Sequence, residues 1–166
     1  MFSGQIYRSC CAATTIVLAA TVPPVTAHAN NTSGVNSTAA VLASCTIVGS
    51  TIAFGTYTST QVDQTGSIAV VCTSGVSYSI GLDAGAGSGA TTAVRKLTGS
   101  QGGTLNYALY SDSARTSNWG ATIGTDTQSG NGNGIAQNLT VYGRIPSAQT
   151  PLAGVYTDTV TVTLTY

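Results

Sequence analysis

The C-terminal segment, Gly154 to Tyr166, most narrowly constrains what this chain can fold into. It reads GVYTDTVTVTLTY, and its last part alternates threonines with apolar residues. The apolar residues are Val160, Val162, Leu164 and Tyr166. A period of two predicts a β-strand with one buried face. No turn or further strand pattern follows it, so we expect this final strand to lack a partner from later in the chain.

Residues 1–29 have the organisation of a secretion signal. Arg8 supplies a positive charge, a short apolar run spans Cys10 to Val22, and Ala27-His28-Ala29 matches a small-residue cleavage site. We expect cleavage between Ala29 and Asn30, which leaves a mature chain the size of one domain. A retained membrane anchor is the alternative, but threonines interrupt a run that is shorter than a bilayer span requires.

Charge is sparse, with five basic and five acidic side chains in the whole sequence. Nucleic acids and anionic membranes attract clustered Lys and Arg, so neither is an expected partner. Low charge also gives little protection against self-association. The composition is therefore more typical of an assembly component than of a freely diffusing enzyme.

Two cysteines, Cys45 and Cys72, remain after the predicted processing. An even number of cysteines in an exported chain predicts one disulfide. A redox pair would have a CxxC spacing, which these residues lack.

Strand patterns recur along the mature chain, and no segment has the pattern of an amphipathic helix. The predicted strands are Thr46–Phe54, Gly66–Thr73, Val76–Leu82, a short segment at Arg95–Leu97, Thr104–Tyr110, Ile135–Ile145 and the C-terminal strand. Ser74-Gly75 is interpreted as a hairpin turn or bulge, and Ser129–Gly134 as a connector. Many short strands separated by turns predict an all-β sandwich.

The N-terminal arm, residues 30–44, also has a period of two. Val35, Ser37, Ala39 and Val41 share one phase, while Leu42 lies on the other. Such a segment is either a flexible tail or a donor strand that adds to the edge of a neighbouring sheet. The pattern alone leaves both interpretations open.

The sequence contains no convincing set of catalytic residues. The single histidine, His28, lies in the signal, so the mature chain lacks the base of the common Ser-His and Cys-His systems. Lys96 is explained as a surface residue beside Arg95, and the scattered aspartates form no specific pair. Trp119 has two interpretations, a surface side chain that binds a sugar or a core side chain that caps the sandwich.

Metal binding is also unsupported, because the segment Asp126–Gly134 lacks the spacing of a calcium loop. We expect no enzyme activity, no cofactor, no metal site and no small-molecule substrate.

Several short motifs, taken in order, resemble one known family. They are Cys45 with Phe54-Gly55 and Tyr57, the strand with Cys72, Arg95-Lys96-Leu97, Leu105 to Asp112, Trp119-Gly120, Tyr142 to Pro146, and Gly154 to Val162. Together they resemble the spore coat protein U domain family, which includes the subunits of Csu-type (archaic) chaperone–usher pili. The resemblance covers residues 45–166, nearly all of the mature chain.

The resemblance implies an incomplete, pilin-type immunoglobulin-like sandwich that lacks one strand and is completed by a donated strand. A periplasmic chaperone would lend that strand, and at the outer-membrane usher the arm of another subunit would replace it. The donor residues would be Val35, Ser37, Ala39 and Val41. The groove edge that contacts the chaperone would be Val160, Val162, Leu164 and Tyr166. An early strand within Thr46–Phe54 would flank the groove on the other side.

The implied function is a structural subunit of a secreted pilus at the cell surface, assembled from identical or related pilins and supporting adhesion and biofilm formation. Two alternatives stay open. One is a spore or cell-surface coat protein of the same fold, and the other is a secreted monomeric carbohydrate-binding module.

Overall fold

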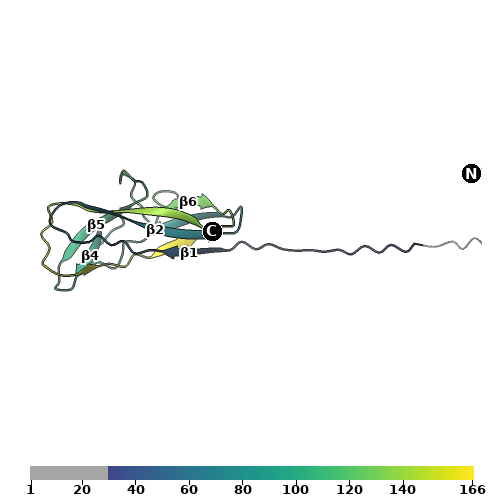
Figure 1. Cartoon of the computed structure of the whole chain (residues 1–166), viewed down its shortest axis with the longest axis horizontal. Helices are drawn as coiled ribbons and strands as arrows, with labels where there is room; N and C mark the ends of the chain where they lie inside the picture. The colour runs from purple at the N-terminus through teal and green to yellow at the C-terminus, as the bar shows by residue number, and fades with distance from the viewer. Residues whose placement is uncertain (1–29) are drawn as a thin grey trace, which may run out of the picture. The chain divides into compact units, whose positions relative to one another are not determined.

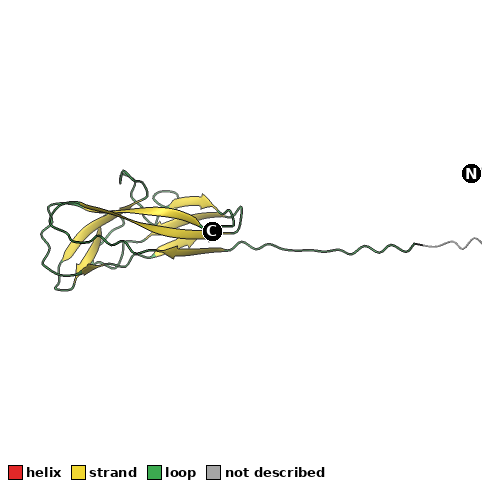
Figure 2. Cartoon of the chain, in the orientation of Figure 1, coloured by secondary structure: helices red, strands yellow, loops and turns green. Residues whose placement is uncertain are grey.

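The computed structural model describes residues 30–166. The predicted signal peptide, with Ala29, lies outside the described residues. Residues 30–39 belong to a separate unit and are exposed and without secondary structure. The unit Ala40–Tyr166 contains every strand (Figure 1). Figure 2 shows strands and loops without helices in residues 30–166, so this part of the chain has no helix that could cross a membrane.

Two antiparallel sheets make up the domain. The first sheet has the order β1-β2-β7-β5-β4-β8, and the second has the order β6-β3-β9. The strands are β1 (Cys45–Gly49), β2 (Val62–Cys72), β3 (Ser77–Leu82), β4 (Arg95–Gly99), β5 (Thr104–Tyr110), β6 (Gln128–Asn131), β7 (Gln137–Ile145), β8 (Tyr156–Thr157) and β9 (Val162–Thr165). This arrangement confirms the predicted all-β class.

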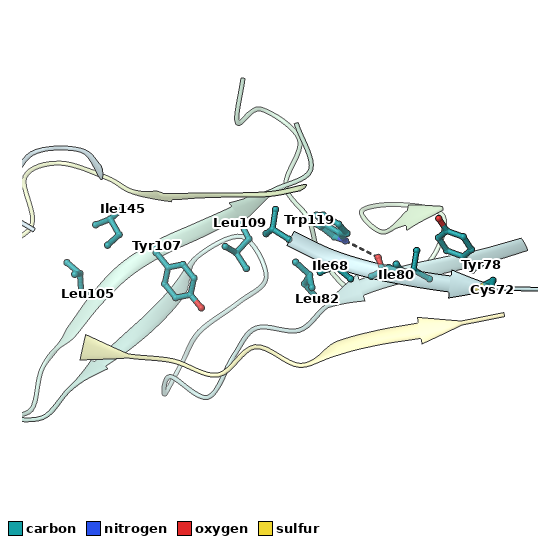
Figure 3. Packing of buried hydrophobic residues seen from close by; sticks show 12 residues of the cluster. Ile68, Cys72, Tyr78, Ile80, Leu82, Leu105, Tyr107, Leu109, Trp119 and Ile145 are labelled. Atoms are coloured by element: carbon teal, nitrogen blue, oxygen red, sulfur yellow. Dashed lines mark hydrogen bonds between the residues drawn. The ribbon is translucent and has the colours of Figure 1, made fainter. Parts of the chain in front are cut away.

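The core is built from alternate residues of the strands, as the period-two patterns predict. On β5 Leu105, Tyr107 and Leu109, which the sequence places on one phase, are buried, and Ala108 between them is buried as well. Figure 3 shows Leu105, Tyr107 and Leu109 with the rest of the buried cluster. Trp119 is 0% exposed, and its indole Nε1–H donates a hydrogen bond of 2.9 Å to the carbonyl of Ile80. Trp119 therefore belongs to the core, and its interpretation as a surface sugar platform is wrong.

Two sequence interpretations of turns are corrected. The Ser74-Gly75 turn exists, with Gly75 at φ 83° and a 3.1 Å bond from the Val76 N–H to the Thr73 carbonyl. It does not form a hairpin, because β2 and β3 belong to different sheets. The connector Ser129–Gly134 contains β6, where Gly130 packs so closely on the Tyr78 ring that a Cβ would lie 2.6 Å from it. Close approach of the backbone to a side chain explains this glycine-containing strand.

The first predicted strand, Thr46–Phe54, is also shorter than expected, because β1 ends at Gly49 and residues 51–58 have no secondary structure. Glycines on the facing strands explain the change. A Cβ at Gly66 would lie 2.6 Å from Ile52, and a Cβ at Gly143 would lie 2.8 Å from Phe54. The segment therefore leaves the ladder and places Ile52 and Phe54 in space that these glycines provide.

The C-terminal pattern is divided between the two sheets rather than forming one strand. Tyr156 and Thr157 pair with β4 in the first sheet, while Val162–Thr165 pairs with β3 in the second. Residues 158–161 carry the chain from one sheet to the other. The predicted alternation holds, since Val160, Val162 and Leu164 are half-buried between exposed threonines. Tyr166 is an exception, because it is 60% exposed.

Arg95 is a buried cation at the start of β4, and it is 0% exposed. Its guanidinium donates hydrogen bonds to four backbone carbonyls. They are those of Asp83 (2.8 Å), Thr92 (2.7 Å), Leu82 (3.0 Å) and Trp119 (2.8 Å). Arg95 thereby connects the first sheet to the end of β3 and to the Trp119 loop. The sequence predicts a surface position for Lys96 and indicates no buried role for Arg95.

Replacing Arg95 with methionine should lower the free energy of unfolding by about 3 kcal/mol, because buried carbonyls lose their donors. Lys96→Met is the matched control, since Lys96 is its neighbour and donates only one bond, to the Ser88 carbonyl. We expect a loss below about 1 kcal/mol for the control. Urea denaturation of the mature chain measures both values, and equal losses would contradict the assigned role of Arg95.

Candidate assembly groove

Two of the four edge strands of the sheets, β1 and β9, lie beside each other. β1 is the first strand of one sheet and β9 is the last strand of the other. They touch where Gly49 faces Val162, since a Cβ at Gly49 would lie 3.6 Å from Val162 Cγ2. No ladder joins them in the described part of the chain. Each strand therefore keeps an unpaired row of backbone N–H and C=O groups, a template for a further strand.

A cleft lies between the chain that follows β1 and the chain that leads into β9. Residues 49–52 and Phe54 form one wall, and Asp158–Val160 with Val162 form the other. Buried apolar side chains from both sheets line its floor, namely Ile68, Leu82, Leu109 and Val141. Its volume is about 280 Å³. An open cleft over core side chains is a site where added apolar groups would be removed from water.

A second cavity of about 620 Å³ continues this cleft. It extends between residues 51–57 and residues 151–158, over Leu105 and Ile145. The two cavities share Ile52, Phe54 and Asp158 among their lining residues. We call the two cavities together the groove.

The sequence predicted four residues for the groove edge, and the structure places them unequally. Val160 and Val162 line the groove. Leu164 packs partly buried against the core, opposite Ile80. Tyr166 lies exposed beyond the end of β9.

The opposite wall comes from the segment Thr46–Phe54, which the family resemblance implied would flank the groove, although Ile52 and Phe54 were not assigned to its lining. Ile52 and Phe54 line both cavities, and the Phe54 ring packs edge-on against Tyr107 with centroids 5.8 Å apart. Gly66 and Gly143 interrupt otherwise strand-like patterns, and glycine within a strand often marks a close approach of another segment. That signal, together with the alternation of Ile52 and Phe54, was available in the sequence.

Asp158 fixes the point where the chain crosses between sheets. The buried Tyr107 hydroxyl donates a 2.7 Å hydrogen bond to Asp158 Oδ2, and the N–H groups of Ala86 and Thr159 donate to Oδ1 at 2.7 and 2.8 Å. Burial raises the pKa of Tyr107 above its ordinary value, and the hydrogen bond to Asp158 raises it further. Tyr107 therefore remains a neutral donor. The arrangement is a structural anchor for the groove wall.

Asp83 holds the same crossing from the end of β3. Its Oδ1 accepts hydrogen bonds from the N–H groups of Gly85 and Thr161, both at 2.9 Å. The Asp83 N–H donates in turn to the Thr161 carbonyl at 3.1 Å. Burial opposes ionisation of Asp83, but the hydrogen bonds from Thr161 and Gly85 outweigh it and hold its pKa below the ordinary 3.8.

The N-terminal side of the groove begins at a disulfide. Cys45 and Cys72 are bonded, with Cα atoms 4.1 Å apart, which confirms the predicted pairing. Val41 precedes this bond and is 85% exposed, and Val35 in the separate unit is 90% exposed. Within residues 30–166 no three His, Cys, Asp or Glu side chains gather as metal ligands.

Comparisons with known proteins agree with this geometry. The model of the Spore Coat Protein U domain matches residues 31–163. Protein U of Myxococcus xanthus is 34% identical over 155 residues, which cover 83% of this chain and 86% of that protein.

A solved structure shares the fold. It is the pre-assembly complex of the chaperone CsuC with the tip adhesion subunit CsuE, from the archaic chaperone–usher Csu pili of Acinetobacter baumannii. The match has a TM-score of 0.59 and 22% identity, and it covers 76% of this chain. The chain spans only 40% of the matched chain. The fold is thus the immunoglobulin-like type of a pilus subunit.

Replacing Asp83 with asparagine should reduce the acid sensitivity of the domain. Because the pKa of Asp83 is lowered on folding, its carboxylate stabilises the fold fully above pH 3.8, and this contribution disappears as the pH falls through the folded pKa. Between about pH 5 and pH 2 we expect the free energy of unfolding to fall by about 1 kcal/mol less in D83N than in the wild type. Urea titrations across this range test the prediction, and parallel pH profiles would contradict it.

Proposed function

The chain belongs to the Spore Coat Protein U domain family, and we propose that it is a structural subunit of a chaperone–usher pilus that polymerises by donor-strand exchange. One observation carries the proposal, namely the groove between the free edges of β1 and β9. A strand placed there would pair with both edges and cover the apolar floor. The role is that of a building block, without catalysis.

Physical chemistry supplies the driving force for such an exchange without ATP. An unpaired buried backbone group costs about 1–3 kcal/mol, and pairing removes this cost. Apolar side chains that enter the groove add roughly 25 cal/mol for each Å² removed from water. A strand that pairs better than the one it replaces is therefore sufficient to move assembly forward.

The proposed donor is the arm, residues 30–44, of a neighbouring subunit. Val35, Ser37, Ala39 and Val41 would face the groove floor. Two of them are small, so the arm would depend more on backbone pairing than on large apolar anchors. The neighbour is identical or related to this chain.

The proposed partners before assembly are a periplasmic chaperone and an outer-membrane usher. The CsuC–CsuE complex, in which a chaperone holds a subunit of this fold, supports the first of them. The chaperone would contact Val160, Val162, Leu164 and Tyr166. We further propose export by residues 1–29, cleavage between Ala29 and Asn30, and a final location on the cell surface, where the fibre supports adhesion and biofilm formation.

A second candidate is a coat protein deposited on a spore or cell surface. The description of the family favours it, and a relative from Myxococcus xanthus bears the name Protein U. Both candidates use the same domain, residues 45–166, in an assembly. Genes for a chaperone and an usher beside the gene for this chain would favour the pilus, whereas a sporulating source without them would favour the coat.

If polymers form through the arm, a charge introduced at an arm residue that faces the groove should reduce assembly, whereas a charge on the opposite face of the arm should not. Val41→Asp would bury an unpaired carboxylate in the neighbour's groove and should reduce polymers at least tenfold, since such burial costs several kcal/mol. Leu42→Asp is the matched control, because Leu42 lies on the opposite phase and should leave polymers intact.

The measurement is a denaturing gel of unheated and heated samples, from periplasmic expression with the presumed chaperone. A wild-type ladder that collapses on heating, and that disappears when residues 30–43 are deleted, is expected. Polymers of V41D at normal yield, or monomers from the wild type, would contradict the proposal.

A further inference from the structure

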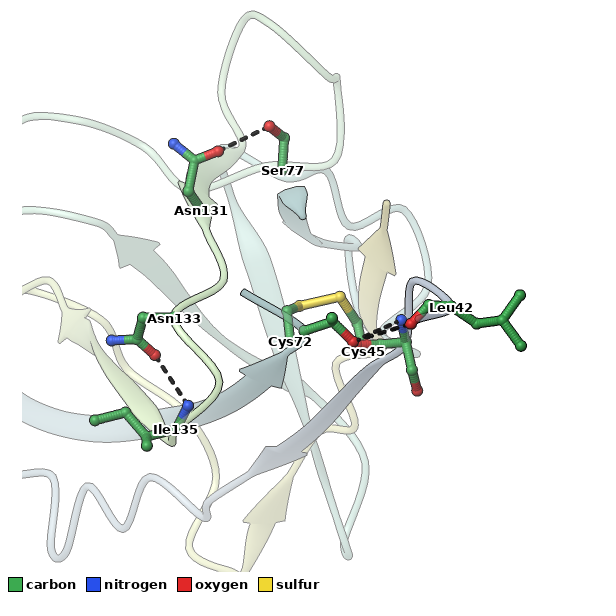
Figure 4. Close-up of a disulfide and its surroundings, with 9 residues drawn as sticks. Leu42, Cys45, Cys72, Ser77, Asn131, Asn133 and Ile135 are labelled. Carbon is green, nitrogen blue, oxygen red and sulfur yellow. Dashed lines mark hydrogen bonds between the residues drawn. A yellow bond between two sulfur atoms is a disulfide. The ribbon is translucent and has the colours of Figure 1, made fainter. Parts of the chain in front are cut away.

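The root of the arm, residues 42–44, is held by one residue, Thr73, which directly follows β2. The β1–β2 ladder ends at the disulfide pair Cys45 and Cys72, and Ser44 and Thr73 are the next pair in register. The Thr73 N–H donates a 2.9 Å bond to the Ser44 carbonyl. Figure 4 shows hydrogen bonds next to Leu42, beside the disulfide of Cys45 and Cys72.

The second half of this pair uses the Thr73 hydroxyl in place of the backbone. In an antiparallel pair the Ser44 N–H would donate to the Thr73 carbonyl. That carbonyl instead accepts from the Val76 N–H in the turn that follows. The Ser44 N–H donates to Thr73 Oγ1 at 3.2 Å, and the hydroxyl lies 3.3 Å from the carbonyls of both Leu42 and Ser44, so it donates to one of them. We call this set of bonds the latch.

The latch holds residues 42–44 in line with β1, and a reversal of the chain there would break its hydrogen bonds. A reversal at this point is the one that would let the arm enter its own groove. If a two-residue loop formed at Ala43-Ser44, the arm would pair antiparallel with β1, with Ala40 opposite Ile47 and Thr38 opposite Gly49. The arm would then extend beyond the end of β1, and Val35 would reach the level of Ile52 in the groove wall. The chain would then supply its own missing strand.

A reversal before the latch does not fill the groove. With a loop at Ala40-Val41, Ala39 would pair with Leu42, and Thr32 would lie opposite Gly49. The mature chain, which is proposed to begin at Asn30, would end before it reached Ile52 and Phe54. Both cavities contain these two residues and would stay open.

We propose that Thr73 is a positioning residue that keeps the arm out of its own groove and so reserves the groove for another copy. This inference rests on the proposed function. The latch and the disulfide together would then determine whether the chain forms a closed monomer or a polymer. The arm then acts only between molecules.

The test compares two triple variants of the mature chain. The latch variant is Ala43→Asn, Ser44→Gly and Thr73→Val, which removes the hydroxyl and offers an Asn-Gly loop suited to a tight hairpin. The control carries the same loop with Thr140→Val in place of Thr73→Val. Thr140 is an exposed threonine on β7 and lies away from the arm root.

Each chain, with its disulfide intact, is unfolded in guanidinium and diluted at low concentration with an excess of a fluorescent peptide of residues 30–44. Size-exclusion chromatography then separates monomers from polymers. We expect the wild type and the control to form polymers without peptide and labelled monomers with it. The latch variant should give at least tenfold more monomer without peptide, and this monomer should stay unlabelled.

Each other outcome has a definite meaning. A latch variant that polymerises like the control, or whose monomers take up the peptide equally, overturns the role of Thr73 while the proposed function stands. A wild type that neither polymerises nor takes up the peptide overturns the proposed function and this inference with it.

Discussion

The free edges of β1 and β9 are the constraint on which the rest of the structure depends. Each sheet ends in a strand with an unpaired backbone on one side, and both edges border the same groove. Such edges usually lead to uncontrolled association. Here the walls of the groove are fixed by specific contacts: the disulfide at the start of β1, the glycines beneath Ile52 and Phe54, and the two aspartates at the crossing into β9. The edge is therefore open but held in a defined shape.

A sandwich that lacks a strand must hold its sheets together by other means. Arg95 and Trp119 supply two such connections, because both are fully buried and both donate to backbone carbonyls around the end of β3. β3 carries β9, so these bonds also support one wall of the groove. The polar groups inside the core thus stabilise the part of the domain that the missing strand would otherwise reinforce.

The sequence predicted β5 most accurately, whereas β2, which also has a strand on each side, begins at Val62 and not at the predicted Gly66. β5 lies between β4 and β7 and has the predicted bounds. Its period-two pattern is a reliable signal because its alternate side chains pack directly into the core. β6 was missed because Gly130 is needed there for the close contact with Tyr78. Tyr78 is distant in the sequence, so no local sequence pattern indicates this contact. The division of the C-terminal pattern was missed for a similar reason. The same alternation continues through the crossing, and only the long-range bonds to Asp83 and Tyr107 break it into two strands.

The groove itself was predicted only through family resemblance, and the reason is physical. A missing strand contributes no residues to the sequence pattern. The local sequence therefore predicts half-buried strands at β1 and β9 but does not predict the space between them. The structure adds that this space is uneven. The two edges touch where Gly49 meets Val162, and the larger of the two cavities lies toward residues 151–157. A strand that paired with both edges would have to separate β1 from β9 where Gly49 meets Val162, so its first contacts would be easier at the larger cavity. Under the proposed function, the small side chains of the arm would need the least separation of the two edges there.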